Sequence, residues 1–338
     1  MPKAVNTDDL KNAAVTYDPI LRELPYFVLN EIAKKLRINI IEVNGEHVLV
    51  NKRRKAGLIR PYTPGLPLGN QQEIMKFFEA KLKPEKTYAE LTDNVTNYDD
   101  VKIISAQGNF SDNKTKEHPL KLIILKDTVI SYSEDVAFNM WFAERDEAVA
   151  SAATAFTGFF PRMDLLLAAG EISAAKDNLR NTGAIVAGTG YDQLVEFIAT
   201  SNPLLRQANP ILYTSEAPLD NALIQYADKV KSHTDPTIED MIKKLRSDAK
   251  CPNLQVVTDP VLGSGDRLTL MLPGLLDLGV NKNADGQFVQ VRTPYKDPND
   301  VQFWIQASYD TRIRDIHPKL FRMNEQKNTA VNYAGDYQ

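Results

Sequence analysis

The stretch Cys251–Gly279, CPNLQVVTDPVLGSGDRLTLMLPGLLDLG, sets the character of the C-terminal part of the chain. Short apolar runs rich in Val and Leu are separated by Pro- and Gly-containing turns, which predicts strands over 254–258 and 267–272. The Gly-Ser-Gly sequence at 263–265 could form a phosphate-binding nest or present a hydrolase serine. The hydrolase turn needs a glycine where Leu262 stands, so a plain turn between two strands explains this sequence better.

The remainder of the chain interleaves helices and strands irregularly and has no internal repeat. Further strands are predicted at 101–105, 120–125, 210–215, 287–293 and 301–316, with a strand-like segment at 183–190. Apolar spacing and capping residues predict helices over 18–36, 70–82, 131–146, 191–200, 218–230 and 235–249. A further helix is predicted from the Ala-rich tract 148–155 to Gly170. These elements place the chain in the α+β class.

A hairpin is predicted around Asn44-Gly45, because this dipeptide between β-branched residues favours a type I′ turn with φ > 0 at both positions. Residues 41–43 would then pair with residues 46–48. The second strand runs directly into four cations, Lys52, Arg53, Arg54 and Lys55. This cluster could be a solvated turn, a contact with another subunit or a contact with nucleic acid.

Composition weakens the nucleic-acid interpretation of the cluster. The 338 residues carry 40 Lys and Arg against 44 Asp and Glu, a formal net charge of −4, whereas a protein that grips a phosphate backbone is normally basic. No aromatic residue interleaves the four cations, so a base-stacking surface is not indicated. The length is sufficient for two domains or one elaborate domain.

The sequence predicts an intracellular soluble protein without a membrane partner. Cys251 is its single cysteine, which excludes an intramolecular disulfide and a cysteine-based metal site. No apolar run approaches the roughly 18 residues that a membrane span requires. Residues 1–11 are polar and include Asp8 and Asp9, unlike a signal peptide.

No motif in the chain indicates catalysis or a bound cofactor. AIVAGTGYDQL (184–194) resembles a dinucleotide-binding turn, but Gln193 stands where the third glycine is needed. NKNADG (281–286) begins like a calcium loop, but Arg292 stands where the bidentate Glu belongs. The four histidines lie far apart in the sequence, at His47, His118, His233 and His317. We therefore expect a protein that is not an enzyme and has no cofactor, metal site or catalytic residue.

Four segments resemble the major capsid proteins of tailed phages, whose fold, the Johnson fold, encapsulin shells share. In chain order these are FTGFFPRMDLLLAAGEISAAKDN (156–178), GYDQLVEFIATSNPLLRQANPILYTSEAPLDNALIQYADK (190–229), the stretch 251–279, and DVQFWIQASYDTRIRDIHPKLFRM (300–323). They are similar to that family's peripheral helix, its axial helix–strand–helix unit, its paired strands and its long terminal strand. The predicted helix from Ser131 would correspond to the long spine helix.

The resemblance implies a phage capsid fold with an axial domain, a peripheral domain with a long spine helix, an extended β-hairpin loop and an N-terminal arm. It divides the chain into an N-terminal arm and helix (1–37), an extended loop or hairpin region (38–118), a peripheral domain with the spine helix (119–182), an axial domain (183–286), and terminal strands that return to the peripheral domain with a C-terminal tail (287–338).

The function implied by the resemblance is that of a major capsid protein. Pentamers and hexamers of such a chain form an icosahedral shell that encloses DNA without sequence-specific binding. Its partners would be further copies of itself, a separate scaffolding protein, a portal and a decoration protein, and it would reside in the virion after assembly in the host cytoplasm. Asn44, Gly45 and the four cations from Lys52 to Lys55 are then candidate assembly contacts.

Three other interpretations stay open at the level of sequence. An encapsulin-like compartment would share the fold and enclose cargo protein instead of DNA. A phage tail or portal-associated protein would form rings or tubes. A nucleotide-binding enzyme would use the glycine turn at 183–191.

Overall fold

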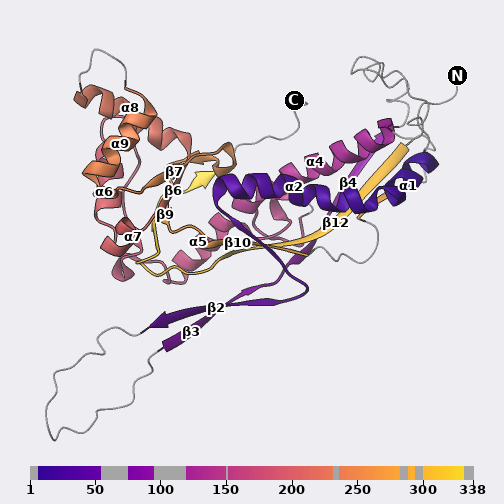
Figure 1. Cartoon of the computed structure of the whole chain (residues 1–338), viewed down its shortest axis with the longest axis horizontal. Helices are drawn as coiled ribbons and strands as arrows, with labels where there is room; N and C mark the ends of the chain where they lie inside the picture. Colours follow the sequence, from indigo (N-terminus) through magenta and orange to yellow (C-terminus); the bar gives the residue numbers. More distant parts are fainter. Residues whose placement is uncertain are drawn as a thin grey trace, which may run out of the picture.

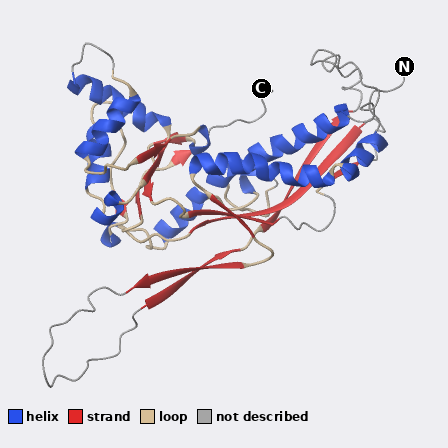
Figure 2. Ribbon diagram, viewed as in Figure 1, coloured by secondary structure: helices blue, strands red, loops and turns tan. Residues whose placement is uncertain are grey.

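The computed structural model describes residues 7–54, 75–94, 119–149, 151–230, 236–281, 288–293 and 300–330. Figure 1 shows an elongated molecule in which long helices and strands occupy one end and a compact group of helices the other. A two-stranded hairpin projects from the middle of the molecule, clear of both ends (Figure 2).

A five-stranded sheet is built around one long strand, β12 (Asp300–Ile313). Antiparallel strands β10 (Leu276–Asn281) and β11 (Val289–Arg292) lie along one edge of β12, and β4 (Glu85–Asn94) lies along the opposite edge. Strand β1 (Asn39–Glu42) completes the sheet by pairing with β10 in parallel. Among the described strands, nothing pairs with the outer edge of β4.

Helices share a hydrophobic core with this sheet. They are α1 (Thr7–Thr16), α2 (Asp18–Leu36), α4 (Pro119–Phe142) and α5 (Phe159–Ala168). Figure 1 shows α2 and α4 running side by side. The helix α2 begins with Pro19 in its first turn and ends before Arg37, which has left-handed backbone angles. At this end the Tyr213 hydroxyl donates a hydrogen bond to the Leu36 carbonyl at 2.7 Å.

A second five-stranded sheet lies between two hydrophobic cores. Its order is β5 (Leu179–Arg180), β13 (Phe321–Asn324), β9 (Leu268–Met271), β6 (Ile211–Thr214) and β7 (Gln255–Val257). Successive side chains of a strand point to opposite faces. Ile211 and Tyr213 of β6 therefore join the first core, whereas Leu212 joins the second.

The second core is closed by four helices at the compact end of the molecule. They are α6 (Gly190–Ala199), α7 (Pro203–Gln207), α8 (Glu216–Val230) and α9 (Ile238–Asp248). A capping box between Thr237 and Asp240 begins α9, so the predicted helix there starts slightly later than expected. Short elements complete the described structure: a two-stranded ribbon of β8 (Ser264–Gly265) and β14 (Asn328–Thr329), and single 3-10 turns at Ala152–Thr154, Ala174–Lys176 and Pro260–Leu262.

The projecting hairpin consists of β2 (His47–Arg54) and β3 (Met75–Leu82), paired antiparallel with His47 opposite Leu82 and Arg54 opposite Met75. Buried Val43, Leu49 and Leu82 form a small cluster at its root. These three residues attach the hairpin to the rest of the molecule.

The predicted pairing across Asn44-Gly45 is wrong. Gly45 does have φ +89°, the left-handed conformation that the turn signal requires, but the strands before and after it belong to different sheets. The amide side chain of Asn39 donates to the Gly274 carbonyl and to Asp277, and the Val43 N–H donates to the Val280 carbonyl. Long-range pairing with β10 therefore overrides the local hairpin signal.

Two helix–strand assignments are also wrong. The predicted helix 70–82 is strand β3 over its described part, 75–82, because pairing with β2 overrides the helix-forming residues there. The predicted strand 120–125 lies inside α4, so that helix begins at Pro119, well before Ser131. A short buried apolar run looks the same in a helix and in a strand, which explains the error.

The segment 183–190 is a loop and not a strand, whereas the predicted strand 101–105 lies outside the described residues. The Ala-rich tract 148–155, predicted as part of the helix ending at Gly170, is not α-helical over its described residues, which include only the 3-10 turn Ala152–Thr154; α5 begins at Phe159. The other predicted helices and strands match elements of the structure, apart from small shifts of their ends.

Candidate functional site

A groove of about 710 Å³ runs along the outer edge of β4. Seven consecutive residues of this strand, 86–92, line it. Because neighbouring side chains of a strand point to opposite faces, a lining without gaps means that the groove follows the edge of the strand and not one of its faces. We call this feature the β4 groove.

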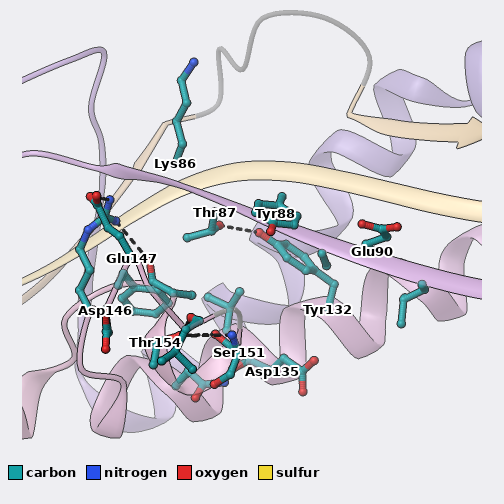
Figure 3. A pocket seen from close by; sticks show the side chains of 18 of the residues that line it. Lys86, Thr87, Tyr88, Glu90, Tyr132, Asp135, Asp146, Glu147, Ser151 and Thr154 are labelled. Carbon is teal, nitrogen blue, oxygen red and sulfur yellow. Dashed lines mark hydrogen bonds and ion pairs between the residues drawn. The ribbon is translucent and has the colours of Figure 1, made fainter.

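One face of α4 forms the opposite side of the β4 groove. Tyr132, Asp135, Val136 and Asn139 line it, at the spacing that places residues on one side of a helix. Residues 145–156 close the end (Figure 3). These parts belong to elements distant in sequence, which the core beneath holds together.

The base of the β4 groove is aromatic. The Thr87 and Tyr132 hydroxyls are hydrogen-bonded at 3.2 Å, as Figure 3 shows. The Tyr132 ring lies 6.3 Å from that of Tyr309, which in turn packs against Phe156 at 5.9 Å. Burial raises the pKa of Tyr132 to about 12, so its hydroxyl stays protonated at neutral pH.

Acidic side chains outnumber basic ones around the β4 groove. Its lining includes Glu90, Asp135, Asp146 and Glu147, against Lys86 and Arg145. Arg145 is already paired, with Glu85 and Glu147, both at 2.8 Å. The acidic surplus favours a cationic partner.

Asp135 is an acid of the β4 groove without an ion-pair partner in the described part of the chain. Among the described residues, its carboxylate has no ion-pair or hydrogen-bond partner, although its own carbonyl accepts from the Asn139 amide. Desolvation in the groove, and secondarily the adjacent Glu134 carboxylate, raise the pKa of Asp135. A cation placed beside it would relieve both effects.

The residues predicted as assembly contacts lie on the projecting hairpin and its root, away from the β4 groove of the same chain (Figure 1). Asn44 and Gly45 are exposed in the link between β1 and β2. The strand β2 includes Lys52, Arg53 and Arg54, whereas Lys55 lies outside the described residues. Their role as contacts stays a prediction.

The glycine turn before α6 has a structural role. The carboxylate of Glu325 accepts hydrogen bonds from the backbone N–H groups of Thr182 and Gly183, which holds the start of this segment in place. A Cβ on Gly190 would come within 2.9 Å of the Ala222 backbone nitrogen, so this glycine allows α6 and α8 to approach closely.

The Gly-Ser-Gly turn likewise joins backbone segments. Gly263 and Gly265 both have positive φ, and a Cβ on Gly265 would lie 2.5 Å from the Lys327 carbonyl oxygen. Ser264 and Gly265 pair with β14. The turn thus holds the segment around β14 against the body.

The described part of the chain contains no group of three or more His, Cys, Asp or Glu side chains arranged to hold a metal ion. Within the same residues, no helix is both long and apolar enough to cross a lipid bilayer. Cys251 is buried, and desolvation raises the pKa of its thiol to about 11.

Comparison with known proteins gives a match at the level of structure alone. No family model and no curated protein matches the sequence. A protein in the procapsid of satellite phage P4, solved with the size determination (Sid) protein, superposes with a TM-score of 0.53 at 13% identity, covering 89% of this chain and 90% of that one. A protein of the cyanophage A-1(L) capsid gives a TM-score of 0.50 at 12% identity over 87% and 92%.

The chain has the fold of a phage capsid protein. This confirms the predicted α+β capsid fold, and the coverage extends it over nearly the whole chain. The division into five regions stays a prediction.

Sequence reasoning did not find the β4 groove or Asp135. The strand β4 pairs with β12, more than 200 residues later in the chain, and no described strand takes its other edge. No local sequence pattern indicates this arrangement. The nearest signal was the pair Glu134-Asp135, which the sequence places in the first turn of a helix. In the structure both residues lie well inside α4, which removes the helix-dipole explanation for their presence.

Proposed function

We propose that this chain is the major capsid protein of a tailed bacteriophage. Its copies assemble as pentamers and hexamers into an icosahedral shell that encloses the DNA genome. The observation that carries the proposal is the capsid fold itself, which extends over 89% of this chain and 90% of the chain from the phage P4 procapsid. In this proposal the protein is structural and has no enzymatic activity.

The projecting hairpin supports a role in assembly. On its described part, Val48 and Val50 are 40% and 58% exposed, and the cluster at its root buries only three side chains. A two-stranded ribbon is marginally stable by itself in water. A second subunit would cover these apolar residues and stabilise the hairpin, and many such weak contacts add up to a stable shell.

The remaining partners follow from the same proposal. A separate scaffolding protein, a portal and a decoration protein would act with the shell, which would form in the host cytoplasm and persist in the virion. A net charge of −4 suits a shell protein that encloses DNA without binding tightly to its phosphate backbone. An encapsulin-like compartment would enclose protein cargo, so analysis of particle contents for DNA or protein separates the two.

Electron microscopy of the expressed protein tests the proposal. We expect closed shells, or isolated pentamers and hexamers, when the chain is produced with its scaffolding protein. A monodisperse monomer at high concentration under those conditions contradicts it.

Replacing the hairpin cations tests their contribution separately. The variant with Lys52, Arg53, Arg54 and Lys55 all changed to Ser should fold normally by circular dichroism and assemble poorly. Normal shells from this variant would assign the cluster to a solvated turn and leave the capsid proposal intact.

A further inference from the structure

We propose that Asn44-Gly45 is an intramolecular modification site of the unassembled subunit. The backbone nitrogen of Gly45 attacks the side-chain amide of Asn44, and hydrolysis of the resulting ring leaves mainly isoaspartate, which loosens the root of the projecting hairpin (Figure 1). The reaction needs only water. The inference goes beyond the proposed shell function, because it holds for a single chain whatever that chain assembles into.

The reaction balances in two steps. In the first step the Gly45 nitrogen bonds to Cγ of Asn44 while the Cγ–Nδ2 bond breaks, and the displaced amide leaves as ammonia with the proton of the Gly45 N–H. In the second step water opens the five-membered imide ring at one of two bonds. Cleavage between the nitrogen and Cγ gives aspartate. Cleavage between the nitrogen and the carbonyl carbon of residue 44 gives isoaspartate, in which the main chain runs through Cγ.

The backbone at Asn44-Gly45 lies between two anchored strands and belongs to neither. β1 ends at Glu42 and β2 begins at His47. On one side the Val43 N–H donates to β10 at 2.9 Å, and on the other the pairing of β2 with β3 starts at His47. The attack requires a backbone nitrogen that can move toward the preceding side chain. A paired strand resists this movement, whereas a link between strands allows it.

The surroundings of Gly45 leave room for the ring. Asn44 and Gly45 are both exposed, and a Cβ built on Gly45 would meet no described atom within 4 Å. The side chain that follows an asparagine normally crowds the attack on Cγ, and glycine has none. Gly45 has φ +89°, which glycine adopts without strain, so it can follow the rotation that ring closure imposes. No other asparagine in the sequence precedes a glycine.

Isoaspartate would lengthen the link at the point where the hairpin is attached. Val43 is 2% exposed and packs with Leu49 and Leu82 in the small cluster at the hairpin root. On the other side of the link, Glu46 pairs with Lys81 of β3 at 2.9 Å. An additional main-chain atom between these two attachments must be absorbed by the link or by the cluster. Because a two-stranded ribbon is marginally stable by itself, a weaker root should increase its local opening.

Peptide mass spectrometry tests the reaction with internal controls. Trypsin releases residues 38–52, a peptide that carries Asn44 together with Asn39 and Asn51. The Asn39 amide is hydrogen-bonded to β10, and Asn51 lies within β2. In unassembled subunits kept at pH 8 and 37 °C, Asn44 should gain one mass unit at least roughly tenfold faster than either control, a barrier lower by about 1.4 kcal/mol. Fragmentation should show more isoaspartate than aspartate.

Two references show whether the folded chain permits the reaction. A synthetic peptide of residues 38–52 gives the rate without a fold, and the folded subunit should react within roughly tenfold of it. Gly45→Ala, checked for folding by circular dichroism, should slow the reaction by roughly tenfold or more. Asn44→Gln should remove the mass change at this position, because its longer side chain would have to close a six-membered ring. A folded subunit slower than the stated range, equal rates at the control asparagines, or no slowing in Gly45→Ala would overturn the inference.

Hydrogen exchange tests the effect on the hairpin. Modified chains carry one more negative charge, so anion exchange separates them from fresh chains. Their β2 and β3 amides should exchange severalfold faster than those of fresh chains. Asn44→Asp carries the same charge on a normal main chain and should exchange like the fresh protein. Unchanged exchange in the modified chains, or equal acceleration in Asn44→Asp, would contradict the proposed effect of the inserted atom. Both measurements use unassembled subunits, so their outcome does not depend on shell formation.

Discussion

The Asp277→Ala substitution should destabilise the chain by about 3 kcal/mol. Asp277 is fully buried on β10, and its carboxylate accepts two hydrogen bonds from Arg314, at 2.8 and 3.0 Å, and one from Asn39 at 2.9 Å. Removing one partner of a buried ion pair costs about 3–5 kcal/mol. Arg314 is 36% exposed and regains water, which reduces this cost to about 2 kcal/mol, and the lost bond from Asn39 adds about 1 kcal/mol.

Urea unfolding of unassembled subunits, followed by circular dichroism, measures this change. The expected loss corresponds to a fall in melting temperature of roughly 4 °C for a chain of this size. An exposed ion pair provides the control: Glu31 and Lys34 are 3.9 Å apart and both largely exposed, so Glu31→Ala should change stability by less than about 0.5 kcal/mol.

A double variant tests whether the charge pair is the cause. Asp277→Leu combined with Arg314→Met replaces both charges by apolar groups, and its stability should return to within about 1 kcal/mol of the wild type. If the free energy of unfolding of Asp277→Ala lies within about 0.5 kcal/mol of the wild-type value, the buried charge pair on β10 does not anchor β1. This result would refute the reasoning.

Three further substitutions or reactions test other parts of the fold. Gly190→Ala should lower stability by about 1–3 kcal/mol in the same urea assay, because its Cβ would meet the Ala222 backbone at 2.9 Å. Arg322→Met should leave stability unchanged or higher: the guanidinium is 2% exposed and bonds Thr200, but its Nε and Nη1 lack partners among the described residues, and each such buried donor costs about 1–3 kcal/mol. Marked destabilisation of this variant would assign the arginine a structural role. Cys251 should resist alkylation by iodoacetamide at pH 8 until urea unfolds the chain, because burial raises its pKa to about 11 and keeps the folded thiol protonated; fast labelling of the native protein would contradict this.

Local sequence signals predicted the compact end of the molecule well. The helices α6, α8 and α9 and the buried strand β6 all follow from capping residues, helical spacing or a continuous apolar run. Each of these signals is contained within a few residues. The elements around β12 depend instead on partners far along the chain, which single-sequence patterns do not encode.

The errors at the hairpin have the same origin. The Asn44-Gly45 signal was correct for the positive φ of Gly45 but not for Asn44. The partner of β1 is chosen instead by contacts with Gly274, Asp277 and Val280. The β4 groove could not be predicted at all, since an edge is free only in relation to the complete strand order. The resemblance of four segments to phage capsid proteins supplied the global arrangement that local patterns lacked.

The sheet shared by the two cores has a consequence for how the sequence can drift. All twelve residues of β6, β9 and β13 are buried, and the apolar residues of β6 and β9 divide between the two cores. These strands therefore have no solvent-facing side on which neutral replacements accumulate. A change of volume at Leu212 disturbs the helical end, and one at Ile211 disturbs the end with the long strands. Distant relatives of this chain are therefore expected to differ least in these short strands, which makes them the best segments from which to search for such relatives.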